Sequence, residues 1–116
     1  MTSRIISLAK SIRFCGIIDK LGEVTEGQYR EGFEHLLTTE QQRKLFVVAA
    51  IRNLSRRQWD NQLGKLRYVI NRYQKVTVIT MPLWEGNQLF VTFDSGEEDY
   101  DAILRKKIIP LIEEFS

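Results

Sequence analysis

The sequence contains one cysteine, one histidine and only two prolines among its 116 residues. The single cysteine, Cys15, excludes an internal disulfide and is typical of a reducing compartment, so we expect a cytoplasmic protein. The longest uninterrupted apolar run has seven residues, far fewer than the roughly 20 that a membrane-spanning helix needs. The first residues lack the apolar core and cleavage site of a signal peptide. We therefore expect no membrane span.

Motifs of catalytic and cofactor sites are also missing. Neither glycine-rich loop of nucleotide-binding proteins occurs, and the Gly-x-Ser-x-Gly elbow of serine hydrolases is absent. Cys15 and His35 are the candidates for a nucleophile and its base, but Cys15 lies in a segment that we expect to be buried. One histidine and one cysteine cannot complete a zinc site, and the acidic cluster at 97–101 lacks calcium-loop spacing. We expect no enzyme activity, no cofactor and no metal.

Apolar periodicity and turn residues predict the element order α-β-β-α-β-β-β-α within a single domain, residues 1–116. The expected helices and strands are a helix at 3–12, strands at 13–19 and 23–29, a helix at 39–62, strands at 65–73, 76–83 and 88–93, and a C-terminal helix. The connector at 30–38 is expected to contain a short helical turn around 33–37. Capping boxes are predicted at Thr39-x-x-Gln42 and Ser95-x-x-Glu98, and Pro110 predicts a bend in the last helix.

This order favours an α+β fold, with a five-stranded antiparallel sheet and helices on both faces. The strands at 13–19 and 88–93 are apolar on both faces, which is typical of central strands. The strand at 23–29 mixes apolar and charged residues and suits a sheet edge. Together these features predict the spatial strand order 2-1-5-4-3, which leaves 65–73 at the other edge.

The most informative stretch is Leu45–Ile51, seven consecutive apolar residues within the predicted long helix. They cover nearly two helical turns, so they need apolar cover on two sides, and a chain of this size offers one. We expect the second side to be a homodimer interface. The residues predicted to form it are Val47, Ala50, Ile51 and Leu54, with Val69 from the next strand. The opposite stripe of the helix, Leu45, Val48, Ala49 and Arg52, remains an alternative, and pairing through the edge strand 65–73 is another.

Charge is distributed unevenly along the chain. Residues 43–75 hold nine basic residues and one acid, for a formal charge of +8, whereas the remainder carries −6. Such a split can steer an acidic partner toward the basic side. The expected partner-binding rim consists of Arg52, Arg56, Arg57, Arg67 and Arg72. The same segment could bind nucleic acid, with Trp59, Tyr68 and Tyr73 as stacking residues.

The opening strand reads Phe14-Cys15-Gly16-Ile17-Ile18-Asp19 and is followed by a glycine turn at Gly22. Together with the element order, this pattern resembles the roadblock/dynein-light-chain domains, which are relatives of profilin-like domains. The segments 29–32, 63–65 and 80–83 are more similar to a group of small uncharacterised archaeal proteins, chiefly from ammonia-oxidising lineages. That second resemblance covers most of the chain and implies no activity.

The roadblock resemblance implies a non-enzymatic platform that pairs through its long middle helix and the following strand. Domains of this kind dock small GTPases or scaffold proteins. We therefore expect a homodimeric adaptor that binds an acidic protein such as a small GTPase. Two alternatives remain, a nucleic-acid-binding module that uses the basic segment 43–75, and a small-ligand sensor that holds its ligand between sheet and helix.

Overall fold

A computed structural model describes residues 1–115. The elements along the chain are α1 (Thr2–Ile6), β1 (Ile12–Ile18), β2 (Val24–Tyr29), α2 (Thr39–Arg56), α3 (Asp60–Leu63), β3 (Val69–Arg72), β4 (Val76–Pro82), β5 (Gln88–Asp94), α4 (Tyr100–Ile103) and α5 (Ile109–Glu113). Short 3₁₀ helices span Arg57–Trp59 and Trp84–Gly86, and a π-helical segment, Leu104–Ile108, joins α4 to α5.

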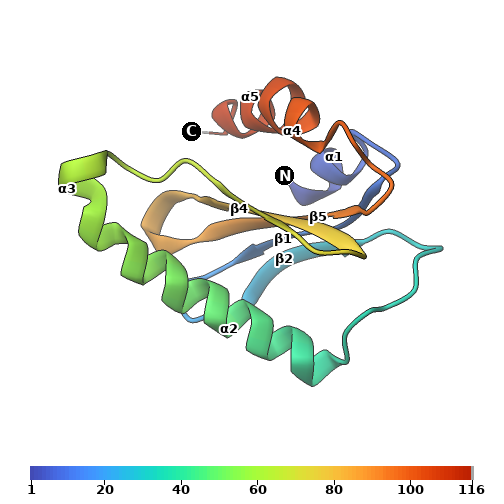
Figure 1. The fold of residues 1–116 in the computed structure, drawn as a ribbon, viewed down its shortest axis with the longest axis horizontal. Helices are drawn as coiled ribbons and strands as arrows, with labels where there is room; N and C mark the ends of the chain where they lie inside the picture. The colour runs from blue at the N-terminus through green and yellow to red at the C-terminus, as the bar shows by residue number, and fades with distance from the viewer. Residues whose placement is uncertain (116) are drawn as a thin grey trace.

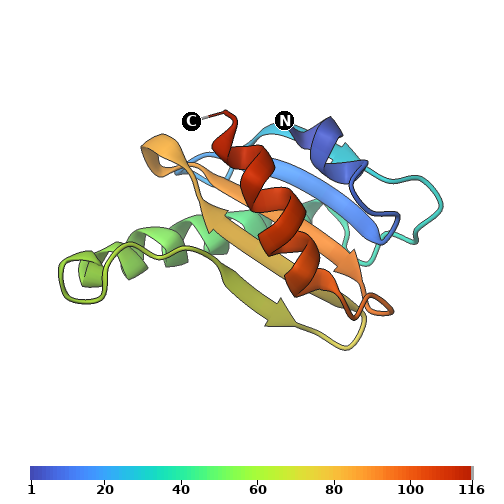
Figure 2. The same ribbon diagram turned by 90° about the horizontal axis from the view of Figure 1, so that it is seen from above.

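The five strands form one antiparallel sheet in the order β2-β1-β5-β4-β3. Helix α2 runs along one face, while α1, α4 and α5 lie on the other (Figure 1). From above, the C-terminal helical segment crosses the central strands of the sheet (Figure 2). The predicted α+β class and strand order are therefore confirmed.

The sheet separates two apolar clusters of unequal size. The larger one lies between the sheet and helices α1, α4 and α5, and it contains Ile5, Cys15, Val91, Phe93 and Leu104. The smaller one lies between the sheet and α2, and it consists of Phe14, Ile18, Phe46, Val78 and Phe90. Strands β1 and β5 contribute to both clusters, which explains why they are apolar on both faces. Helix α2 therefore covers its face of the sheet less completely than the C-terminal helices cover theirs.

The first two helices differ from prediction at their ends. Helix α1 stops at Ile6 instead of residue 12, and the carbonyls of Ile6 and Ala9 accept hydrogen bonds from the Arg30 guanidinium. Helix α2 is capped by Thr38, whose hydroxyl accepts from the Gln41 N–H at 3.1 Å while the Gln41 side chain accepts from the Thr38 N–H. The predicted capping box was one residue out of register. The helical path ends at Gly64, as predicted, where φ is +81°.

The connector and the third strand also differ from prediction. No helical turn forms at 33–37. Strand β3 has four residues rather than nine, and its ladder with β4 begins at the pair Val69–Thr80. Continuing that register would place Arg67 opposite Pro82, and proline has no N–H to donate to a ladder. The pairing therefore ends before the proline.

The last helix starts later and bends differently than expected. It begins at Tyr100, and the predicted Ser95-x-x-Glu98 capping box does not form. Instead, the carboxylate of Glu97 accepts hydrogen bonds from the Ser11 hydroxyl at 2.6 Å and from the Asp99 N–H at 3.0 Å, which lowers its pKa. The π-helical segment at Leu104–Ile108 widens the helix just before Pro110. The irregularity predicted from the proline is thus a π-helical turn.

Candidate protein-interaction surface

Helix α2 is held against the sheet by a narrow inward stripe. Phe46, Ala50 and Asn53 are its buried residues, at 4 to 6% exposure. The Gln88 side chain donates a hydrogen bond to the Ala49 carbonyl at 2.9 Å, which links strand β5 to the helix backbone. At Gly22, a Cβ atom would lie 2.7 Å from the Cα of Val47, so only glycine lets the β1–β2 turn approach the helix this closely.

The opposite side of α2 exposes a row of apolar side chains. Exposure is 43% at Val47, 41% at Val48, 62% at Ile51 and 68% at Leu54. Three of the four helix residues predicted for the interface thus lie on this surface. The fourth, Ala50, is only 6% exposed because it packs on the chain's own sheet, so its assignment to the outward stripe was wrong. We call the surface formed by Val47, Val48, Ile51 and Leu54 the α2 face.

Both stripes weighed from the sequence contribute to this surface. Val48 was placed in the alternative stripe, yet it is exposed beside Val47. Leu45 and Ala49, from the same alternative stripe, are partly buried against the smaller core cluster. The seven-residue apolar run therefore has the two-sided character expected of it. Its inner side is covered by the sheet and its outer side is uncovered in the monomer.

Strand β3 forms the edge of the sheet next to this helix. It pairs with β4 on one side, and no other described strand pairs with its outer side. Ile70 packs into the larger core, and the Arg72 guanidinium lies over the Tyr100 ring at 4.6 Å, so these two side chains face the C-terminal helices. Because side chains alternate along a strand, Val69 and Asn71 face the α2 side. Val69 is half-buried there.

The predicted basic rim is split between the two faces of the sheet. Arg52 and Arg56 line a shallow recess together with Asn71, next to the α2 face. Arg72 lies on the opposite face over Tyr100, so its inclusion in one continuous rim was wrong. Arg57 and Arg67 are exposed. Within residues 1–115, none of the five arginines forms an ion pair with an acid.

A stacking platform for nucleic acid is incomplete at this surface. Trp59 and Tyr73 are each 53% exposed, but Tyr68 packs against the larger core cluster. Tyr68 therefore cannot stack on a base in this fold. The basic segment retains its charge, but one of its three predicted aromatic contacts is missing.

The total accessible surface is large for the mass of the chain. It amounts to 7635 Å², whereas a compact monomer of 13.6 kDa exposes about 6,600 Å². The difference of about 1,000 Å² is similar to the area that one partner contributes to a standard protein interface, about 800 Å².

The candidate catalytic pair does not assemble. Cys15 belongs to the larger core cluster, and burial raises the pKa of its thiol to about 12. His35 lies on the other side of the sheet, in the connector before α2, with its ring edge-on to Tyr29 at 5.5 Å. Within the described chain, no three histidine, cysteine or acidic side chains group as metal ligands. None of the helices in residues 1–115 is long and apolar enough to cross a bilayer.

The sheet order, the long helix on one face and the C-terminal helices on the other define a roadblock fold. The chain is similar in structure to MglB from Myxococcus xanthus, with a TM-score of 0.71 at 14% identity over 98% of this chain and 89% of that one. A Roadblock/LC7 domain from Streptomyces avermitilis gives a TM-score of 0.70 at 14% identity, over 97% and 89% of the two chains. A further structure, MglB with a tetrameric arrangement, gives 0.68 at 14% identity over 91% and 82%.

These likenesses show the fold. No protein-family model matches the sequence, and no curated protein matches it. The similarity to small archaeal proteins therefore stays a prediction.

Proposed function

We propose that this protein is a non-enzymatic, homodimeric adaptor that docks a second, acidic protein. The observation that carries the proposal is the α2 face, where four adjacent apolar side chains are 41 to 68% exposed on a well-anchored helix. An apolar row of this kind on a rigid element is typical of an interaction surface. The roadblock fold supports the proposal, because the structural neighbours include an MglB with a tetrameric arrangement.

A twofold homodimer suits this surface because a twofold axis beside α2 would set the apolar row of one copy against that of the other. In such a dimer each apolar side chain is buried twice, once in each copy. Burying the exposed parts of Ile51 and Leu54 contributes about 1–2 kcal/mol per side chain and copy. The adjacent β3 edge could extend the contact by pairing with its counterpart, which would also cover its unpaired backbone groups. Val69 lies between these two elements and would join the interface.

The arginines without ion-pair partners support the second part of the proposal, the docking of an acidic protein. Arg52, Arg56 and Arg57 follow the apolar residues along the helix and its 3₁₀ extension. No acid in residues 1–115 neutralises them, so they present a positive rim beside the dimer surface. Such a rim speeds association with an acidic protein and makes the complex sensitive to salt. A small GTPase is the partner that the roadblock resemblance implies, and a cytoplasmic location would suit it.

The homodimer is tested by substituting Ile51→Glu and measuring mass by light scattering after size exclusion. Because the twofold axis doubles each substitution, we expect the dimer to dissociate at least about a hundredfold more readily. Phe115→Glu is the matched control, because Phe115 is also exposed, at 46%, but its ring lies 5.7 Å from the Arg4 guanidinium of α1, and α1 is on the other side of the sheet (Figure 1). An Ile51→Glu protein that keeps the wild-type dimer mass contradicts the proposed interface.

The docking role is tested with a second variant that removes the rim charge. The triple variant, with Arg52→Ala, Arg56→Ala and Arg57→Ala combined, should remain a homodimer. At low salt it should no longer retain the proteins that the wild type captures from a native lysate. Raising the salt concentration should weaken the wild-type complex in the same way. A wild-type protein that retains no protein partner, or a triple variant that retains the same partner at all salt concentrations, contradicts the adaptor role.

A further inference from the structure

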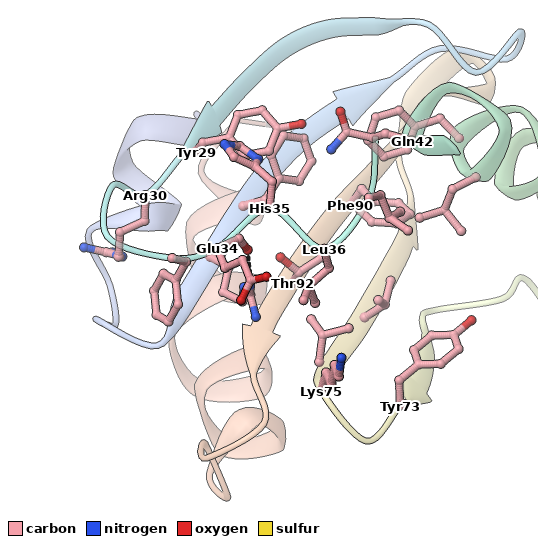
Figure 3. Close-up of a pocket in the computed structure, with 18 of the residues that line it drawn as sticks. Tyr29, Arg30, Glu34, His35, Leu36, Gln42, Tyr73, Lys75, Phe90 and Thr92 are labelled. Carbon is pink, nitrogen blue, oxygen red and sulfur yellow. Dashed lines mark hydrogen bonds between the residues drawn. The ribbon is translucent and has the colours of Figure 1, made fainter. Parts of the chain in front are cut away.

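A cavity of about 620 Å³ opens on the α2 side of the sheet, beneath the connector 30–38 (Figure 3). Its floor is formed by strands β1, β4 and β5, through Phe14, Val78, Phe90 and Thr92. Its walls are the connector and the beginning of α2. This volume falls within the range of small-molecule sites, which is about 300–1,000 Å³.

The cavity exists because α2 leaves part of its sheet face uncovered. The helix begins at Thr39, yet its first buried residue is Phe46. Before Leu45, the helix contributes no side chain to the smaller core cluster on this face of the sheet. The connector crosses the remaining gap, and its residues Leu36 and Leu37 are 39% and 42% exposed. These two leucines line the cavity and are half exposed. They would therefore gain apolar contacts if a ligand filled the cavity.

The connector is anchored on both sides of its leucine pair. The Arg13 side chain donates a hydrogen bond to the Glu34 carbonyl and lies 4.9 Å from the centre of the Phe33 ring. His35 meets the Tyr29 ring edge-on. The next fixed point is Thr38, which caps α2. The cavity is thus framed by two anchored points, with the leucine pair spanning the space between them.

Aromatic rings dominate the cavity floor. The Phe46 ring lies 5.9 Å from Phe14 in a stacked arrangement and 5.0 Å from Phe90 in an edge-on arrangement. The Tyr29 ring lies 4.5 Å from Phe14 and extends the group toward the connector. The three phenylalanine rings pack on one another, and the Tyr29 ring, 48% exposed, offers the surface on which a flat aromatic guest can stack.

The lining charges favour an anion. Three cationic side chains, Arg13, Arg30 and Lys75, face one acid, Glu34. Arg30 is bound to three backbone carbonyls, and Arg13 is paired with Asp94 at 3.5 Å. Lys75, in the β3–β4 turn at the edge of the cavity, has no ion-pair partner within residues 1–115 (Figure 3). Its ammonium group is the charge left for a ligand.

We propose that this cavity binds a small aromatic monoanion, with its rings against Tyr29 and the phenylalanine rings of the floor, and its acidic group at Lys75. The leucine pair of the connector closes over the ring system. This ligand site is separate from the α2 face and does not depend on dimer formation.

The test uses two fluorescent probes that differ by one charge. Anilinonaphthalene sulfonate has an aromatic body and one anionic group, and N-phenylnaphthylamine is its neutral parent. Wild-type protein should bind both with a saturable rise in fluorescence and one site per chain. Lys75→Gln should weaken the sulfonate about fivefold, the effect of one partly solvated charge pair, and leave the neutral probe unchanged. Lys106→Gln, an exposed lysine on the C-terminal helical segment, is the matched control and should bind both probes as wild type does.

Two further variants locate the binding. Thr92→Phe places a ring in the cavity and should abolish binding of both probes in protein whose circular dichroism remains native. Leu36→Glu changes an exposed wall residue, so folding is preserved, and it should repel the sulfonate more than the neutral probe. Ile51→Glu alters the α2 face and should leave both affinities unchanged.

A wild-type protein that binds neither probe overturns the proposal. Binding that survives Thr92→Phe and Leu36→Glu but is lost in Ile51→Glu places the probe on the α2 face and also overturns it. Equal effects of Lys75→Gln on both probes refute the role of Lys75 in recognising an anion.

Discussion

Arg30→Met offers a sharp test of how the chain assembles the region before α2. Arg30 follows β2 directly, and its guanidinium reaches three carbonyls in the segment that leads from α1 into β1. It donates to Ile12 at 2.8 Å, to Ala9 at 3.0 Å and also to Ile6. These carbonyls belong to a segment that leaves the helical path early, so the arginine takes the place of part of the missing helix hydrogen bonding.

The expected loss follows from these bonds. Hydrogen bonds from a charged donor contribute about 1.5–3 kcal/mol each, and water can partly replace a donor at this half-buried site. Taking about 1 kcal/mol for each carbonyl gives a destabilisation of about 3 kcal/mol. Methionine keeps much of the apolar stem, so the change isolates the guanidinium.

Urea denaturation followed by circular dichroism measures the free energy of unfolding. For a domain of this size a loss of about 3 kcal/mol moves the midpoint by about 1.5–2 M urea. Arg30→Lys should recover only part of the loss, because one ammonium group cannot fork across three carbonyls. Arg67→Met, at an exposed position without a hydrogen bond in the described chain, should change the midpoint little. A free energy of unfolding for Arg30→Met within about 0.5 kcal/mol of wild type, the range of an ordinary surface substitution, would refute this role of the guanidinium.

Three more predictions concern single side chains. Phe46→Ala removes the central ring of the smaller core, which is 4% exposed, and should cost about 3–5 kcal/mol in urea unfolding; a loss under about 1 kcal/mol would contradict the packing. The Thr2 hydroxyl, at 2.7 Å, and the Thr2 N–H lower the pKa of Glu26 below its ordinary value of 4.5. The stabilisation by ionised Glu26 is therefore present above pH 4.5 and is lost as the pH falls through the lowered folded-state pKa, so the stability of Glu26→Gln should change less with pH in that range than that of wild type. Cys15, with its pKa raised to about 12, should resist iodoacetamide at pH 8 in the native state and react once urea unfolds the chain, and mass spectrometry should detect no adduct before unfolding.

The fold was predictable because its strongest signals are local. Phe14 and Cys15, neighbours on β1, supply side chains to opposite core clusters, and Phe90 and Val91 do so on β5. Strands buried on both faces must lie inside a sheet, and that requirement places β1 beside β5. The polar composition of β2 then leaves it at the edge. Strand order could therefore be predicted without any knowledge of long-range contacts.

Element ends were less predictable because neighbouring residues offer equivalent chemistry. Thr38 and Thr39 each stand three residues before a glutamine, so the sequence contains two capping boxes in adjacent registers. The structure selects Thr38, and Phe46 and Ala50 then face the sheet. The rotation of the helix about its axis determines which apolar residues remain exposed. With this rotation Ala50 packs on the sheet, so it is not part of the exposed surface.

The arrangement of the charged residues and of the cavity could not be predicted, because it brings together residues that are distant in sequence. Arg72 turns away from Arg52 because alternation on β3 directs it toward Tyr100. Phe14, Leu36, Phe46, Lys75 and Phe90 come from five different segments, and no periodic pattern joins them. The two adjacent leucines, in a connector whose only other large apolar residue is Phe33, were the available sequence signal for this cavity. Their significance became visible only once the fold had placed the connector above the phenylalanine rings.

The proposed function depends most on a second copy of the chain covering the α2 face. Sedimentation equilibrium on the wild-type protein over a range of micromolar concentrations tests it most directly. We predict a mass of about 27 kDa, twice the 13.6 kDa of one chain, with dissociation only on dilution. A mass of 13.6 kDa at every concentration would contradict the homodimer and leave the α2 face without its proposed occupant.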